Sequence, residues 1–236
     1  MEQELSQLTQ RLTSALGERV VSIVLYGSAA MGDWSKGSSD LNVLCALDRV
    51  SPQELSQSEP IFRWWREKGN PPPLLLTEEE VRTSTDCFAM EFHDMQEHRR
   101  VLYGADIIQG LPIDRSFYRA QVEHELRATQ IRLRQKAAEV LRDPERLGKL
   151  LSDSLSTFCV LGRHALILSG HEPRWKKNEV LAALETALRL PLKGANAILA
   201  IRAVGKPSTD ANAVSLLEKY LNETDALVRF VDVLDR

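Results

Sequence analysis

The stretch YGSAAMGDWSKGSSDLN, residues 26–42, decides the fold expected of this chain. An apolar, β-branched run from Val20 leads into it and predicts a buried strand that ends at Gly27. Asp40-Leu41-Asn42 is expected to open a second buried strand, which runs to Leu47. Because successive side chains of a strand point to opposite faces, residues 40 and 42 should project from the same face.

The turn at Gly27 suits a phosphate group. Glycine lets the backbone approach a ligand, and the Ser28 hydroxyl and nearby N–H groups can donate to phosphate oxygens. We expect a helix to follow the turn, and a helix N-terminus favours negative charge. A Gly-Ser pair also occurs in ordinary strand-ending turns, so it indicates a site only together with Asp40 and Asn42.

Asp40 and Asn42 are the predicted metal ligands. Two carboxylates at these positions could hold the Mg²⁺ pair that clamps a nucleoside triphosphate. Asn42 offers a neutral oxygen, and Mg²⁺ depends mainly on anionic ligands, so Asp40 is the principal ligand. The sequence thus predicts a nucleotide-binding site at Gly27, Ser28, Asp40 and Asn42, with Asp40 as its catalytic residue.

Helical and extended patterns alternate along the rest of the first half. Leucines at helical spacing from Leu5 to Leu16 predict an amphipathic helix. Ser51-Pro52-Gln53-Glu54 is a capping box that opens a second helix, and Thr77 to Glu80 open a short third one. This order predicts an α/β (α+β) domain with a mixed sheet of four or five strands. Further strands are expected at 74–76, 88–95 and 99–103.

From Phe117 onward every patterned segment is helical. The helix that starts there carries an apolar stripe. The segment 149–169 is apolar nearly all round, which suits the interior of a bundle. We therefore expect an all-α helical bundle after the first domain, with domain bounds of 1–112 and 113–236. Its later helices are expected near 178–189, 194–204 and 209–235.

With these elements the chain resembles the nucleotidyltransferases of the DNA polymerase β superfamily, in the branch of small bacterial enzymes that includes the antibiotic adenylyltransferases. Their motif is an apolar strand, Gly-Ser, a spacer and Asp-x-Asp or Asp-x-Glu, which residues 20–42 resemble. HRRVLYG, residues 98–104, resembles their closing strand R-x-V-L-Y. The resemblance implies a small α/β catalytic domain followed by a helical bundle. It also implies transfer of a nucleoside monophosphate from a nucleoside triphosphate such as ATP to a hydroxyl of a small-molecule or protein acceptor, with Mg²⁺.

Three departures from the family pattern leave the activity open. Met31 stands where the family often has an arginine, Asn42 replaces the second carboxylate, and the strand at 73–77 lacks the third. That third group would be the candidate base for the attacking hydroxyl. An alternative hypothesis is a catalytically impaired nucleotide-binding or interaction protein that keeps the fold. Carboxylates that could replace the missing one are Asp33 in the loop, Glu91 and Asp94 on the next expected strand, and Glu123 and Glu125 in the helical half.

Composition excludes several other classes of protein. No apolar run is long enough to span a bilayer and the amino terminus lacks a signal-peptide pattern, so a cytoplasmic protein is expected. The three cysteines are far apart and predict neither a disulfide framework nor a zinc site. Through Arg115 there are 11 Lys and Arg against 18 Asp and Glu, and beyond it 19 against 15. The slightly basic second half could face a polyphosphate. Its excess of basic residues is too small to predict a nucleic-acid partner. The sequence leaves open whether the protein forms a homodimer.

Overall fold

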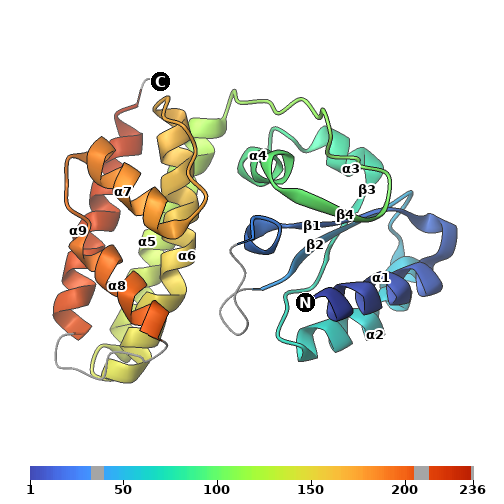
Figure 1. The fold of residues 1–236 in the computed structure, drawn as a ribbon, viewed down its shortest axis with the longest axis horizontal. Coiled ribbons are helices and arrows are strands. Elements are labelled where there is room, and N and C mark those ends of the chain that lie inside the picture. Colours follow the sequence, from blue (N-terminus) through green and yellow to red (C-terminus); the bar gives the residue numbers. More distant parts are fainter. Residues whose placement is uncertain (33–39, 205–212, 235–236) are drawn as a thin grey trace. The chain divides into compact units, whose positions relative to one another are not determined.

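The computed structural model describes residues 1–32, 40–204 and 213–234. Within it the chain forms two compact units, Met1–Phe117 and Tyr118–Arg236 (Figure 1). Asp33, one of the candidate replacement carboxylates, lies outside the described residues, as does the expected start of the last helix at 209–212.

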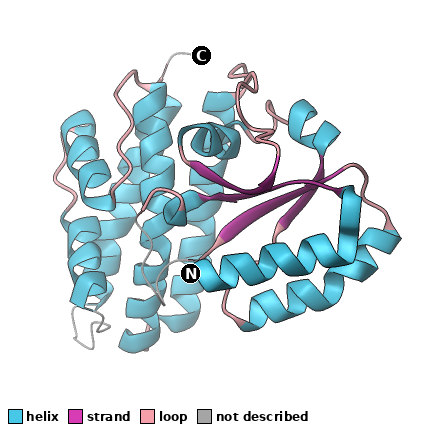
Figure 2. Ribbon diagram, turned by 45° about the vertical axis from the view of Figure 1, so that its right-hand side comes forward, coloured by secondary structure: helices cyan, strands magenta, loops and turns pink. Residues whose placement is uncertain are grey.

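A four-stranded mixed sheet forms the centre of the first unit, as expected (Figure 2). Its strand order is β3-β2-β1-β4. The central strand β1 (Val20–Tyr26) pairs antiparallel with both β2 (Asn42–Leu47) and β4 (Arg99–Gly104). The strand β3 (Leu74–Thr77) runs parallel to β2 at one edge. Because β1 and β2 are buried on both faces, they read in the sequence as continuous apolar runs.

Helices cover both faces of this sheet (Figure 1). On one face α1 (Glu2–Leu16) and α2 (Pro52–Glu67) pack their apolar stripes against Ile23 and Leu25. On the other face α3 (Glu78–Thr83) and α4 (Ala89–Glu97) pack against Val24 and Leu44. The alternation of β1 side chains between these two cores is the period-two pattern of a strand. Two short 3-10 turns, η1 (Gly17–Arg19) and η2 (Gly27–Ala29), flank β1.

The segment 88–95 is a helix and not the expected strand. Alternating large residues at 88, 90 and 92 suggested an extended chain, but Phe88 is half exposed. The buried positions of α4 follow helical spacing instead, because Ala89, Phe92 and Met95 recur every three residues, and Phe92 and Met95 pack in the core on the sheet. Glu91 and Asp94 consequently project from a helix.

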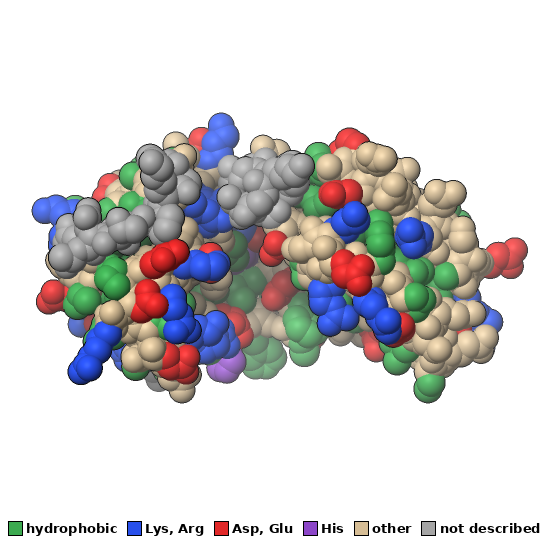
Figure 3. Space-filling model, turned by 90° about the horizontal axis from the view of Figure 1, so that it is seen from below, with side chains coloured by type: hydrophobic (Ala, Val, Ile, Leu, Met, Phe, Trp, Pro, Cys, Tyr) green, Lys and Arg blue, Asp and Glu red, His purple; other side chains and the backbone are tan. Residues whose placement is uncertain are grey.

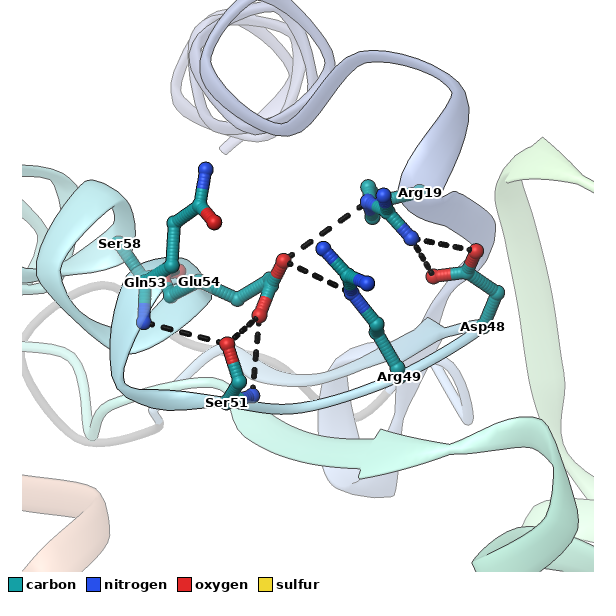
Figure 4. Close-up of polar contacts among 7 residues, drawn as sticks. All are labelled: Arg19, Asp48, Arg49, Ser51, Gln53, Glu54 and Ser58. Atoms are coloured by element: carbon teal, nitrogen blue, oxygen red, sulfur yellow. Dashed lines mark hydrogen bonds and ion pairs between the residues drawn. The ribbon is translucent and has the colours of Figure 1, made fainter.

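The start of α2 is held by the predicted capping box and by a buried carboxylate (Figure 4). Gln53 N–H donates to Ser51 Oγ at 3.2 Å, and Ser51 N–H donates to Glu54 Oε2 at 3.0 Å. Glu54 is only 1% exposed, and its Oε1 lies 3.4 Å from Arg49 Nε and 3.7 Å from Arg19 Nε. These contacts tie α2 to the loop before it and to the residue that precedes β1.

Replacing Glu54 with glutamine should lower stability in a pH-dependent way. The Ser51 hydroxyl, and then Arg49, hold the pKa of Glu54 below its ordinary value of 4.5. A carboxyl whose pKa is lowered on folding stabilises the protein above the unfolded-state pKa, and this contribution is lost as the pH falls through the folded pKa. In thermal unfolding, Glu54→Gln should therefore melt below wild type at about pH 7 and approach it at about pH 3. Glu59→Gln, at an exposed position of the same helix, is the control, and an equal deficit at both pH values would contradict this account.

Arg99, the first residue of β4, joins three parts of the first unit. Its Nε donates to both oxygens of Asp106, at 2.8 and 3.0 Å. Its Nη1 donates to the carbonyl oxygen of Gln96 at 2.6 Å, at the end of α4. The arginine of the R-x-V-L-Y segment thus fixes the α4–β4 junction to the loop that follows β4, through the charge-assisted hydrogen bonds that guanidinium and carboxylate favour.

The second unit is a bundle of helices, as expected. The helix α6 (Pro144–Leu168) packs against each of the other helices, and most of its second half is buried. Glu223 caps another helix from a distance, because its carboxylate accepts the N–H groups of Gly194 and Ala195 at 2.6 and 2.8 Å. Burial raises the pKa of Glu223. The other helices are α5 (Tyr118–Val140), α7 (Lys177–Leu188), α8 (Lys193–Val204) and α9 (Ala213–Asp232).

The surface carries charges of both signs. On the face drawn in Figure 3, Lys and Arg side chains are interspersed with Asp and Glu over both units. Within the described parts of the chain, no helix combines the length and the apolar character needed to cross a membrane.

Candidate functional site

The predicted phosphate turn lies at the end of the central strand. β1 passes at Gly27 into the single turn η2, and Gly27 has φ of 74°, in the left-handed region that glycine tolerates best. Its carbonyl oxygen accepts from the N–H groups of Ala30 and Met31 at 3.0 and 3.2 Å. The Ser28 side chain makes no hydrogen bond within the part of the chain that the structure describes. Its hydroxyl is therefore available to a ligand.

The helix expected after this turn is only one turn long up to Gly32, where the described segment ends. A helix dipole grows with the number of aligned peptide groups, so one turn contributes little beyond its own N–H groups. Phosphate binding at Gly27 would therefore depend on local backbone donors and on the Ser28 hydroxyl.

The next strand begins at Asn42, two residues later than expected. Tyr26 and Asn42 form the last register pair of β1 and β2, and beyond it Gly27 turns away, so Asp40 lies outside the described strand ladder. The alternation of side chains nevertheless continues outside the strand. Leu41 is 1% exposed and packs in the core beneath α1 and α2, whereas Asp40 is exposed and Asn42 is half-buried.

Gly27 and Asn42 lie directly against each other. The side-chain nitrogen of Asn42 is 3.0 Å from the position that a Cβ atom on residue 27 would occupy. Any larger residue at 27 would press on this carboxamide. The phosphate turn and the second predicted metal ligand are thus neighbours in space, although 14 residues separate them along the chain.

The polar groups of Asp40 and Asn42 are not engaged by the rest of the described protein. Neither side chain makes a hydrogen bond or ion pair with any described residue. The exposed carboxylate of Asp40 and the carboxamide of Asn42 can therefore turn toward a ligand without breaking such interactions. An oxygen from each, together with phosphate oxygens, is a donor set suited to Mg²⁺.

Among the candidate replacement carboxylates that the structure describes, Glu91 is the one that can be related to Tyr26, the last residue of β1. Burial, and then the negative charge of Glu91, raise the pKa of the Tyr26 hydroxyl. Tyr26 faces the core beneath α3 and α4, the helix pair to which Glu91 belongs. Asp94 lies one turn further along α4, 3.7 Å from His93. The strand β3 contains only leucines and a threonine, so it supplies no carboxylate.

Glu123 and Glu125 belong to the second unit and have partners on their own helix. Glu123 accepts from Arg119 and Arg127, both at 2.8 Å, and the hydrogen bond from Arg127 is the main cause of its lowered pKa. Glu125 lies 3.6 Å from Arg132. Ion pairs of this kind commonly stabilise an exposed helix face, so these contacts give neither glutamate a ligand-binding role.

Asn70 is a residue of this region that the sequence did not single out. Its Oδ1 accepts the backbone N–H of Leu41 at 3.1 Å, between the two predicted metal ligands, and Asn70 is 8% exposed. The sequence signal at this position was only that Gly69-Asn70 and the prolines after it end a helix. A contact across 29 residues depends on how α2 packs and has no local signature.

A solved structure resembles this one over nearly the whole chain. The structure is similar to the crystal structure of spectinomycin adenyltransferase AAD(9) from Enterococcus faecialis with ATP and spectinomycin. The TM-score is 0.60 at 14% sequence identity, over 95% of this chain and 99% of that one. The chain therefore has the nucleotidyltransferase fold followed by a helical region, as the motifs predicted. No protein-family model and no curated protein matches the sequence.

Proposed function

We propose that this protein transfers a nucleoside monophosphate from a nucleoside triphosphate, ATP in the first instance, to a hydroxyl group of an acceptor. The observation that carries the proposal is the direct contact between the Gly27 turn and Asn42, with the exposed carboxylate of Asp40 two residues away. This arrangement lies in a fold shared end to end with an adenyltransferase whose structure holds ATP and spectinomycin. That pair of ligands favours a small hydroxylated molecule over a protein as the acceptor.

Each residue has a distinct role in the proposed reaction. Backbone N–H groups of the Gly27 turn and the Ser28 hydroxyl would bind phosphate oxygens. Asp40 would be the principal Mg²⁺ ligand and Asn42 a neutral one, since Mg²⁺ in such sites is held by one or two carboxylates together with substrate phosphates. The ion, when bound, neutralises charge that develops on the phosphates. Glu91 is the residue that we propose as the base for the acceptor hydroxyl, in place of the carboxylate absent from β3.

A second function, nucleotide binding without catalysis, is favoured by two specific observations. Asn42 lowers the charge of the metal site, and β3 presents no carboxylate to the acceptor. A protein of this kind would bind ATP through the Gly27 turn and would form no product.

Replacing Asp40 with alanine should separate the two functions. We expect wild type to bind Mg-ATP more tightly than metal-free ATP in calorimetric titration, and to release pyrophosphate when an aminocyclitol acceptor such as spectinomycin is added. Asp40→Ala should lower the rate of release at least about 100-fold, because it removes the anionic metal ligand and hence several kcal/mol of charge stabilisation. Asp48→Ala, at the opposite end of β2, is the control and should keep the wild-type rate.

The contrary result is equally specific. In this outcome, wild-type protein binds ATP equally well with and without Mg²⁺ and forms no product with any acceptor tested. This result would exclude the transferase function and support nucleotide binding without catalysis. Pyrophosphate release that persists in Asp40→Ala would show that the proposed metal ligand is wrong.

A further inference from the structure

Asn70 joins the end of α2 to the backbone between the two predicted metal ligands. Its carboxamide oxygen accepts the N–H of Leu41 at 3.1 Å, in a buried hydrogen bond. The strand ladder cannot replace this bond, because register pairing between β1 and β2 stops at Asn42. Leu41 is thus held by its N–H and by its side chain, which is fully packed in the core beneath α1 and α2.

The backbone around Asn70 is constrained on both sides. Its own N–H donates to the carbonyl oxygen of Trp65 at 3.4 Å, and the Trp65 side chain is completely buried. Gly69 has φ of 87°, which ends α2 and turns the chain toward Leu41. Three prolines, 71–73, follow and restrict the backbone on the other side. Few alternative positions are therefore open to the carboxamide.

The Asn70 side chain is an uncharged acceptor, and this affects the predicted metal site. A neutral acceptor can fix the Leu41 N–H without placing a second negative charge beside Asp40. The variant Asn70→Asp would make the same hydrogen bond, but its negative charge would change the attraction of the site for a cation. Asparagine supplies the hydrogen bond to the Leu41 N–H without adding a charge, so Asp40 remains the charged group of the predicted metal site.

We infer that Asn70 is a positioning residue of the metal–nucleotide site. It acts through the Leu41 backbone and holds the segment so that Asp40 and Asn42 project opposite the buried Leu41 side chain. This inference rests on the proposed nucleotidyltransferase function. Mobility of this segment would cost affinity, because every ligand-bound complex would have to order it first.

The test compares Asn70→Ala and Asn70→Asp with wild type by two measurements. In ligand-free protein, hydrogen exchange of the Leu41 amide should be at least about tenfold faster in Asn70→Ala and close to wild type in Asn70→Asp, since aspartate keeps the acceptor. In calorimetric titration, Mg-ATP should bind about tenfold more weakly to Asn70→Ala. Asn70→Asp should bind more tightly than Asn70→Ala and show a shifted dependence on Mg²⁺ concentration.

Ser58→Ala is the matched control. Ser58 is, like Asn70, a buried polar residue; it lies within α2, is 1% exposed, and its hydroxyl donates to the carbonyl oxygen of Glu54 at 2.8 Å. Its loss should lower stability without changing Leu41 exchange or Mg-ATP affinity. If the alanine variant does not fold, Asn70→Leu, which keeps most of the side-chain volume but lacks the acceptor, makes the same comparison.

Two failures can be told apart. Unchanged Mg-ATP affinity in Asn70→Ala, with wild-type binding intact, would overturn the positioning role alone. Wild-type protein that binds no Mg-ATP would overturn the proposed function and the role of Asn70 with it, while faster Leu41 exchange in Asn70→Ala would still identify a purely structural anchor.

Discussion

Replacing Gly104 with alanine is expected to destabilise the first unit by about 3–5 kcal/mol, a large fraction of the stability of an ordinary domain. A Cβ atom at this position would lie 2.0 Å from the carbonyl oxygen of Val21 and 2.9 Å from its carbonyl carbon. Both atoms belong to the central strand β1, which is paired on both sides and cannot move away. Gly104 also has φ of 74°, which adds about 1–2 kcal/mol of strain for any other residue.

Urea unfolding with Gly110→Ala as a control measures the steric part of this effect. Gly110 has a similar φ of 73° in the same unit, but no described atom lies within 4 Å of its Cβ position. Its alanine variant should therefore lose only the strain of the left-handed backbone, about 1–2 kcal/mol. Equal losses in the two variants would mean that β4 can separate from β1 at little cost, contrary to the pairing of Ser22 with Gly104.

Trp65→Ala should cost about 3–5 kcal/mol, the usual range for deleting a large aromatic side chain from a core. Trp65, on α2, is 0% exposed and belongs to the core that it shares with the buried leucines of α1 and the sheet. The substitution would leave a large cavity at the centre of this layer. It would also loosen the support of Asn70, whose N–H is bonded to the carbonyl oxygen of Trp65.

Trp64→Ala is the natural comparison, because the two rings are adjacent and their centroids lie 5.8 Å apart. Trp64 is only partly buried, and the guanidinium of Arg11 lies over its ring at 4.4 Å. Its removal should cost about 1–2 kcal/mol, from partial burial and one cation–π contact. The two free energies of unfolding can be compared in denaturant titrations, and a Trp64 variant that is as unstable as the Trp65 variant would contradict the assignment of Trp65 to the core.

Locally encoded features were predictable from the sequence. The capping boxes at Ser51 and Thr77 are present as expected, because each needs only two side chains three residues apart. The buried strands β1 and β2 follow from uninterrupted apolar runs, and the mixed sheet and helical bundle follow from the order of such elements. The error at 88–95 has the same origin, since a short apolar segment satisfies both helical and extended periodicity until its packing partner is known.

Part of the candidate site could also be named from the sequence, and part depends on the tertiary structure. Gly27, Ser28, Asp40 and Asn42 can be named from residue type and spacing, and their assignment to nucleotide and metal binding remains a prediction. The missing carboxylate on β3 was also visible in the sequence. Its proposed replacement, Glu91, was one of several alternatives, and only the folding of α4 against the Tyr26 face distinguishes it.

By itself, then, the sequence determined the fold class and the type of chemistry to look for, because apolar periodicity, caps and the Gly-Ser turn act over a few residues. Only the tertiary structure decided which groups meet. Asn42 against Gly27, Glu91 near Tyr26 and Asn70 on the Leu41 N–H join residues that lie from 15 to 65 positions apart in the chain. Such contacts depend on the packing of whole helices onto a sheet, which no short stretch of sequence specifies.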